Sequence, residues 1–402
     1  MHSATNTPKT IKYQELINAI FAKYATQYLS VTVAGIIAKT SVASYLTNIL
    51  IAAGYTVGNF TPTTINHSHE QITINNIPIN SDEFFQIKNS ILAVSHGNKH
   101  IHPVLLTALI AHYYFNSKCV DIALFEISGS TLEYFTEKLK PYLKIITTPT
   151  TSALSRHTAE NTQHLVTGAA KLSNFLLPQF QALANKTLIF KHHYALIVHP
   201  LALDVVTPTH KFYSLPLPNI RTMSQMENIA MAMAAIAVIM NHYPVNNGDI
   251  KQGILNTNLH GRFQLINGPA AIVIDVAHNK QALTAMVKNM VKLPYAANNI
   301  AVFSWEKSTN LDTCIKMCNK LFSRWYIAKA DKLSTLAINK MIAVMAKNNI
   351  ETKSIYPYLT IHEAFTAANN YVAQFEPKAR IVCFGSNMVI KEVLPIFTNM
   401  RK

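Results

Sequence analysis

Residues 28–53 read YLSVTVAGIIAKTSVASYLTNILIAA and join a strand, a short loop and a helix. The apolar, β-branched run at 28–35 predicts a buried strand, and the apolar spacing at 40–53 predicts a helix. The loop between them, GIIAKTS, occupies the place of a phosphate-binding loop, where backbone N–H groups and a helix N-terminus face phosphate oxygens. Lys39 would neutralise phosphate charge there, and the hydroxyls of Thr40 and Ser41 suit Mg²⁺.

The glycine content weakens this interpretation of the loop. The chain has 402 residues but 11 glycines, whereas an average composition of roughly 7% would give about 28. Gly35 is present, but Ala38 stands where such loops carry a second glycine. A side chain at a position that needs positive φ costs about 1 kcal/mol. Spacing alone therefore leaves an ordinary strand–helix junction as an equal alternative.

Strands and helices alternate along most of the sequence, which predicts an α/β fold with a mostly parallel sheet. EQITINNIPI at 70–79 alternates with period two around Asn75-Asn76 and predicts a hairpin. Two domains are expected, at 1–258 and 259–402, the second a Rossmann-like unit of βα repeats. The other predicted strands are 55–60, 121–127, 143–147, 271–275, 300–304, 325–328 and 380–384, and the main helices are 101–115, 280–293 and 311–322.

Composition excludes several classes of protein. Apolar residues make up 49% and charged residues 14%, which is incompatible with a disordered chain. No apolar run reaches 18 residues, so no membrane span is expected, and the N-terminus lacks a signal core, which predicts a cytoplasmic protein. The net charge is +15, but the lysines are scattered rather than clustered, which argues against a nucleic-acid partner. A phosphate-rich or polyglutamate ligand stays compatible with this charge.

A second candidate motif combines Gly261-Arg262-Phe263 with Asp275-Val276-Ala277-His278. An aspartate at the carboxyl end of a buried strand lies at the sheet edge where α/β proteins place their sites. Asp275 could orient an arginine or a ribose there, and His278 could face phosphate. The alternative is structural: Asp275 caps the next helix, with His278 in its first turn.

GRFQLINGPAAIVIDVAHNKQAL, at 261–283, resembles the signature that opens the C-terminal domain of the folylpolyglutamate synthase/dihydrofolate synthase family, part of the Mur-ligase superfamily. The phosphate-loop segment, the hairpin at 70–79, and LPLPNIRTMSQMENIAMAMAAI at 215–236 resemble further family segments in the same order. The resemblance implies a Mur-ligase-like fold, with an N-terminal P-loop-type ATPase domain and a C-terminal Rossmann-like domain.

The resemblance also implies an activity: ATP-dependent addition of L-glutamate to dihydropteroate or to the γ-glutamyl tail of a folate. In this chemistry ATP and Mg²⁺ activate a carboxylate as an acyl phosphate, which the glutamate amine then attacks. A monomer is expected. Carried over by position, the catalytic residues are Lys39, Glu126, His157 and Lys171, and the metal ligands are Ser41, Glu126 and His157. The nucleotide-binding residues are Gly35, Lys39, Thr40, Ser41, Asn228, Arg262, Asp275 and His278.

Several family positions differ in this chain. The family loop G-T-N-G-K reads GIIAK here, the S-P-H-L loop reads Thr61-Pro62-Thr63-Thr64, and the aspartate before His157 is Arg156. Two alternatives therefore stay open beside a working ligase. One is a family member that has lost ligase activity and serves as a binding or scaffold protein. The other is an amino-acid ligase of the Mur type.

Overall fold

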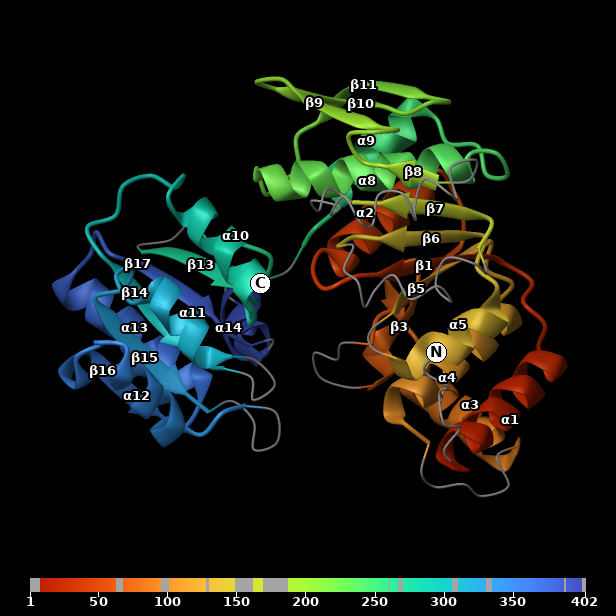
Figure 1. Ribbon diagram of the computed structural model, residues 1–402. Helices are drawn as coiled ribbons and strands as arrows, with labels where there is room; N and C mark the ends of the chain where they lie inside the picture. The colour runs from red at the N-terminus through yellow and green to blue at the C-terminus, as the bar shows by residue number, and fades with distance from the viewer. Residues whose placement is uncertain are drawn as a thin grey trace, which may run out of the picture. The chain divides into compact units, whose positions relative to one another are not determined.

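The computed structural model describes residues 8–62, 68–94, 101–127, 130–148, 162–168, 187–259, 261–266, 270–305, 310–329, 335–386 and 388–399. The chain separates into two compact units, residues 1–258 and 259–402 (Figure 1). The candidate residues His157 and Lys171 lie outside the described residues. No described helix is long and apolar enough to cross a membrane.

The first unit is built on an eight-stranded sheet with the order β4-β3-β2-β5-β1-β6-β7-β8. Strands β2 and β5 to β8 run parallel to β1, and the β3–β4 hairpin adds antiparallel strands at one edge. The predicted mostly parallel sheet is confirmed. The strands are β1 (Leu29–Ala34), β2 (Val57–Phe60), β3 (Ile72–Ile74), β4 (Ile77–Pro78), β5 (Ile122–Ile127), β6 (Leu143–Ile146), β7 (His164–Thr167) and β8 (Thr187–Ile189).

Helices cover both faces of this sheet. One face packs against a cluster of apolar side chains from α1 (Pro8–Lys23), α3 (Ser81–Val94), α4 (Pro103–Ser117) and α5 (Glu133–Leu139). On the other side, α2 (Lys39–Ala52) packs against α8 (Met223–Ile239) and α9 (Asn247–Asn256) (Figure 1). A three-stranded antiparallel sheet of β9 (Ala195–Val198), β10 (Ala202–Val206) and β11 (Lys211–Pro216) packs on α8 and α9. This small sheet was not predicted.

The predicted hairpin is present, with a two-residue turn. Asn75 and Asn76 have φ of 49° and 64°, the left-handed values that both central residues of such a turn require. Asparagine tolerates this conformation better than most residues. The side chain of Asn75 also accepts a hydrogen bond from the Val57 N–H at 2.8 Å, which ties the turn to the start of β2.

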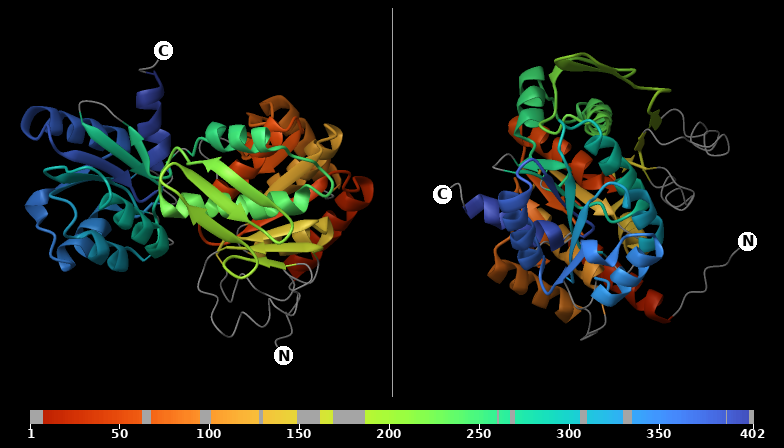
Figure 2. Two further views of the ribbon diagram at one scale, coloured as in Figure 1. Left: turned by 90° about the horizontal axis from the view of Figure 1, so that it is seen from above. Right: turned by 90° about the vertical axis from the view of Figure 1, so that its left-hand side faces the viewer.

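The second unit has a six-stranded sheet with the order β12-β13-β17-β14-β15-β16. All neighbouring pairs are parallel except β12 with β13. Figure 2 shows the sheet between two helical layers: α13 and α14 pack on one face, and α10, α11 and α12 lie side by side. The elements are β12 (Gln264–Ile266), β13 (Ala271–Asp275), α10 (Lys280–Met290), β14 (Asn299–Phe303), α11 (Leu311–Cys318), β15 (Arg324–Ala328), α12 (Ile338–Lys347), β16 (Ile355–Tyr358), α13 (Ile361–Phe375), β17 (Arg380–Phe384) and α14 (Met388–Asn399).

Candidate functional site

The loop between β1 and α2 begins at Gly35 and ends at Ala38. Gly35 has a φ of 136°, and a Cβ there would lie 2.2 Å from Thr147 Oγ1, so no other residue fits without displacing its neighbours. Ala38 is left-handed, with φ 69° and ψ −4°, immediately before the first residue of α2. The position at which the sequence lacks its expected glycine therefore does adopt the conformation that glycine favours. The loop keeps this backbone shape despite the alanine.

Thr147, which directly follows β6, holds this loop from outside. Its Oγ1 lies 2.5 Å from the Ile37 carbonyl oxygen and 3.1 Å from that of Ala34. A hydroxyl has one proton to donate, so the two carbonyls share it, with Ile37 the nearer acceptor. The Ile37 N–H points to Thr148 Oγ1 at 3.4 Å. The hydroxyls of Thr147 and Thr148, which follow β6, thus hold the backbone of Ile37 in place.

Lys39 is the first residue of α2, and its Nζ donates a hydrogen bond to the Gly35 carbonyl at 2.7 Å. The ammonium group is therefore folded over the loop that it follows. Lys39 also begins α2, and the N-terminus of a helix is where the helix dipole favours an anion.

Glu126, near the carboxyl end of β5, is 1% exposed and receives hydroxyl groups from two other elements. Thr40 Oγ1 donates to its Oε2 at 3.0 Å, and Thr61 Oγ1 donates to its Oε1 at 2.8 Å. Thr40 belongs to the first turn of α2, and Thr61 follows β2, whose last residue pairs with Phe125. One carboxylate and two hydroxyls thus meet beside the lysine, all of them hard oxygen donors of the kind that Mg²⁺ prefers.

Ser41, the other hydroxyl of the loop motif, is buried on α2. The hydrogen bonds that reach Glu126 come from Thr40 and Thr61 instead. Thr61 was not singled out from the sequence. Its place directly after a strand that is adjacent to β5 was the signal that could have identified it. Among the described residues, no group of three or more His, Cys, Asp and Glu side chains could hold a metal ion.

Asn228 lies on α8 and is buried, at 6% exposure. Its Nδ2 donates to Gln225 Oε1 at 3.1 Å, one helical turn earlier. Its side chain is therefore held by its own helix through the amide nitrogen.

The three candidates of the second unit gather at the carboxyl end of β13. Asp275 Oδ1 accepts from the Ala277 N–H at 2.8 Å, and Arg262 attracts the carboxylate electrostatically. His278 Nδ1 lies 2.8 Å from the Val276 carbonyl. Because a carbonyl oxygen can only accept, Nδ1 carries the proton, which leaves Nε2 of a neutral imidazole free to accept from a ligand. A carboxylate, a guanidinium and an imidazole thus share one sheet edge.

The structural alternative for this motif is wrong in both of its parts. Asn279, not Asp275, is the N-cap of α10, since its side chain accepts from the Ala282 N–H. His278 precedes the helix rather than lying in its first turn. Asparagine is as good an N-cap as aspartate, and Asn279 stands one residue before the helix begins. Asp275 therefore does not cap the helix and lies at the end of β13, at the sheet edge.

Burial raises the pKa of Asp275 to about 7, against the opposing effects of Arg262 and two backbone N–H groups. A carboxyl whose pKa is higher in the folded than in the unfolded chain stabilises the fold when protonated. The unfolding free energy of the second unit should therefore fall as the pH rises from about 4 to about 7, by roughly 3 kcal/mol more in the wild type than in D275N. Both tryptophans lie in this unit, so their fluorescence during urea unfolding reports it. An equal pH dependence in the two proteins would contradict this assignment.

Known proteins resemble this chain in both sequence and fold. Residues 261–387 match the family model described as "Mur ligase, glutamate ligase domain". The chain is similar to the dihydrofolate synthase/folylpolyglutamate synthase of Buchnera aphidicola, at 23% identity over 91% of this chain and 87% of that protein. Its fold is also that of E. coli FolC solved with DHPP and ADP, with a TM-score of 0.83, 17% identity, and coverage of 97% of this chain and 93% of that one.

A Yersinia pestis folylpolyglutamate synthase/dihydrofolate synthase solved with AMPPNP and Mn ion has the same fold. The TM-score is 0.82, with 16% identity, and the match covers 99% of this chain and 95% of that one. The parallel sheets, the loop before α2 and the matched C-terminal region together define a protein of the Mur-ligase class. Within that class, the proteins that the chain resembles over most of its length are dihydrofolate synthase/folylpolyglutamate synthases.

Proposed function

We propose that this chain is an ATP-dependent ligase that adds L-glutamate to dihydropteroate, to the γ-glutamyl tail of a folate, or to both. The observation that carries the proposal is the meeting of Lys39, Thr40, Thr61 and Glu126 around the start of α2. Such a reaction transfers the γ-phosphoryl group of ATP to a carboxylate, and the glutamate amine then displaces phosphate. It needs charge neutralisation and alignment of anions rather than a protein nucleophile.

The residues divide these tasks between them. The backbone N–H groups of the loop and the Lys39 ammonium would bind the β- and γ-phosphates. Ser41, Glu126 and His157 would hold Mg²⁺, with Thr40 and Thr61, whose hydroxyls donate to Glu126, as further oxygen ligands. Bound Mg²⁺ would neutralise charge that develops on the phosphoryl oxygens. The related Yersinia pestis enzyme was solved with AMPPNP and Mn ion, which supports a nucleotide and a divalent cation here.

The remaining candidate residues would bind the nucleotide and the substrate. Asn228 would contact the adenine, and Arg262, Asp275 and His278 would also bind the nucleotide, as the family resemblance implies. Lys171 would lie near the acyl phosphate. E. coli FolC was solved with DHPP and ADP, which supports a pterin substrate and ATP for this chain. We further propose that the protein works in the cytoplasm as a monomer. Light scattering of the purified chain would test the monomeric state.

Purified protein incubated with Mg-ATP, dihydropteroate and L-glutamate is expected to release phosphate and to form a product heavier by one glutamyl residue. Omission of any one substrate should prevent product formation. Calorimetry with millimolar ATP that shows no binding would contradict the ligase and favour a scaffold role. Transfer to a peptidoglycan precursor but not to a pterin would instead favour a Mur-type amino-acid ligase. Rescue of a cell that lacks its own dihydrofolate synthase is the matching test in vivo.

Replacing Ala38 with glycine is expected to stabilise the first unit by about 0.5 kcal/mol, because glycine adopts a φ of 69° without a Cβ penalty. The affinity for ADP should rise as well, since the phosphates meet less bulk. The matched control is Ala53→Gly at the other end of α2, where φ is −77°. Glycine brings no relief at that position, so A53G should lower stability. Both tryptophans lie in the second unit, so the unfolding step that circular dichroism detects and tryptophan fluorescence does not should report the first unit. A loss of stability in A38G would show that the alanine is not strained.

A further inference from the structure

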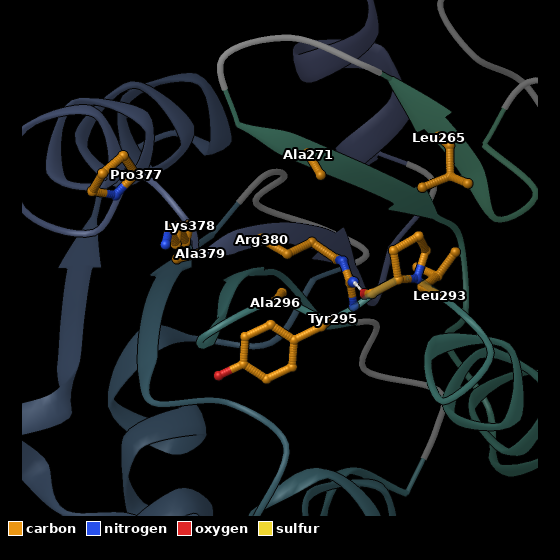
Figure 3. Close-up of a pocket in the computed structure, with 10 residues that line it drawn as sticks. Leu265, Ala271, Leu293, Tyr295, Ala296, Pro377, Lys378, Ala379 and Arg380 are labelled. Atoms are coloured by element: carbon orange, nitrogen blue, oxygen red, sulfur yellow. Dashed lines mark hydrogen bonds between the residues drawn. The ribbon is translucent and has the colours of Figure 1, made fainter.

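A cavity of about 370 Å³ lies in the second unit, at the end of the sheet opposite to Asp275. Strand β13 runs from Ala271, which lines the cavity, to Asp275, so the two features lie at opposite ends of one strand, about 13 Å apart. The size is within the range of sites for small molecules. Its walls include Leu265, Ala271, Leu293, Tyr295, Lys378 and Arg380 (Figure 3).

Arg380 is the unusual member of this lining. The side chain is 6% exposed, at the first residue of β17, and Figure 3 shows it running along the pocket between Ala271 and Tyr295. Its guanidinium donates to the Pro294 carbonyl and, at 3.3 Å, to Asn299 Oδ1. Both acceptors are neutral. A guanidinium has five N–H donors, so within the described part of the chain most of them are left for a ligand.

The charge of Arg380 is not balanced by a carboxylate among the described residues, since no ion pair there includes it. Glu376, four residues earlier, is bonded instead to Asn298 Nδ2 at 2.9 Å and to the Tyr371 hydroxyl at 2.7 Å. Burial lowers the pKa of Arg380, and no acidic neighbour acts against this effect. Arginine is rarely buried without a counter-ion, because desolvation of its charge is costly. The missing partner is an anion.

The other walls indicate what this anion carries. Lys378 is exposed at the rim and adds a second positive charge, while Leu265, Leu293 and Pro294 provide apolar surface. Tyr295 is 90% exposed, so its ring is available to cover a bound molecule. We propose that this cavity binds a small organic anion, whose carboxylate or phosphate pairs with Arg380 and whose apolar part lies against Leu265, Leu293 and Tyr295. The site uses residues of the second unit alone and does not depend on nucleotide binding.

Benzoate is a suitable probe, because it joins a carboxylate to an apolar ring, and benzamide is its neutral counterpart. Saturation-transfer NMR on the full chain, without nucleotide, should show saturable benzoate binding in the millimolar range. Benzamide should bind at least about 10-fold more weakly, because it has no negative charge to form an ion pair with Arg380. Equal binding of the two probes, or no saturable benzoate signal from the wild type, would overturn the proposal.

Substitutions locate the binding. Arg380→Met should weaken benzoate binding by about 10-fold or more, whereas Arg262→Met, the same change at the opposite sheet edge, should leave it unaltered. Arg380 is buried, so tryptophan fluorescence must first show that R380M is folded. Tyr295→Ala changes an exposed side chain and provides a second test that does not threaten the fold: its affinity should fall about threefold. Unchanged binding in both R380M and Y295A, or loss of binding in R262M alone, would place benzoate elsewhere.

Discussion

Replacement of Lys39 with methionine is expected to lower kcat/KM for the ligase reaction by about a thousandfold or more. The ammonium lies 2.7 Å from the Gly35 carbonyl, at the loop that we propose binds the phosphates. Methionine keeps the length and the helix propensity but removes the charge. Loss of one preorganised group that stabilises developing negative charge typically costs a factor of about 10²–10³, and a full positive charge costs more.

The measurement is phosphate release under saturating glutamate, together with ADP affinity by calorimetry. Lys340→Met is the matched control, since Lys340 is an exposed residue of α12, and this variant should keep full activity. If K39M retained more than about a tenth of wild-type kcat/KM, Lys39 would not be a phosphate ligand. The loop would then be an ordinary strand–helix junction.

The second large effect is expected for Glu126→Gln. Two threonine hydroxyls donate to this buried carboxylate at 2.8 and 3.0 Å, and the glutamine amide has nearly the same shape. The fold should therefore be kept, while the negative charge that attracts Mg²⁺ is lost. We expect kcat to fall by at least about a hundredfold and to become insensitive to Mg²⁺ concentration over a range in which the wild type responds.

The Mg²⁺ titration separates this role from a structural one. A residue that merely supported the fold would lower the melting temperature and leave the Mg²⁺ dependence of the residual activity unchanged. Removing a buried charge should instead leave the metal-free melting temperature equal or higher. Glu137→Gln, an exposed residue on α5, is the control for the loss of one negative charge, and it should behave as wild type.

Much of the fold could be predicted from the sequence, because buried parallel strands and amphipathic helices have strong periodic patterns. The strand expected at 28–35 is β1, Leu29–Ala34, and the helix expected at 40–53 is α2, Lys39–Ala52. The β9–β11 sheet was missed. Its strands are short, and Ile197, Val198 and Tyr213 are exposed, so the alternation of apolar and polar residues that identifies a half-buried strand is blurred.

The candidate site was predictable only in part, because spacing along the chain does not give proximity in space. The family resemblance predicted that Lys39 and Glu126 belong to one site. Lys39 bonds to the loop at Gly35, and Glu126 bonds to Thr40, the next residue after Lys39. Thr61 was overlooked because it stands in a segment that differs from the family pattern. It lies next to Glu126 only because β2 pairs with β5. The roles proposed for Asn228, Arg262, Asp275 and His278 stay predictions until a nucleotide complex is examined.

The contact between Thr147 and the Ile37 carbonyl has an evolutionary consequence. In a trans peptide the N–H points opposite to the C=O, so a carbonyl drawn toward Thr147 turns the Ala38 N–H to the other side, away from the adjoining strand. The hydroxyl thus supplies the orientation that a glycine would otherwise reach by its own freedom. Two positions, separated by 110 residues between Ile37 and Thr147, are thereby epistatic. Valine at 147 should be tolerated in a chain with glycine at 38 and costly in this one.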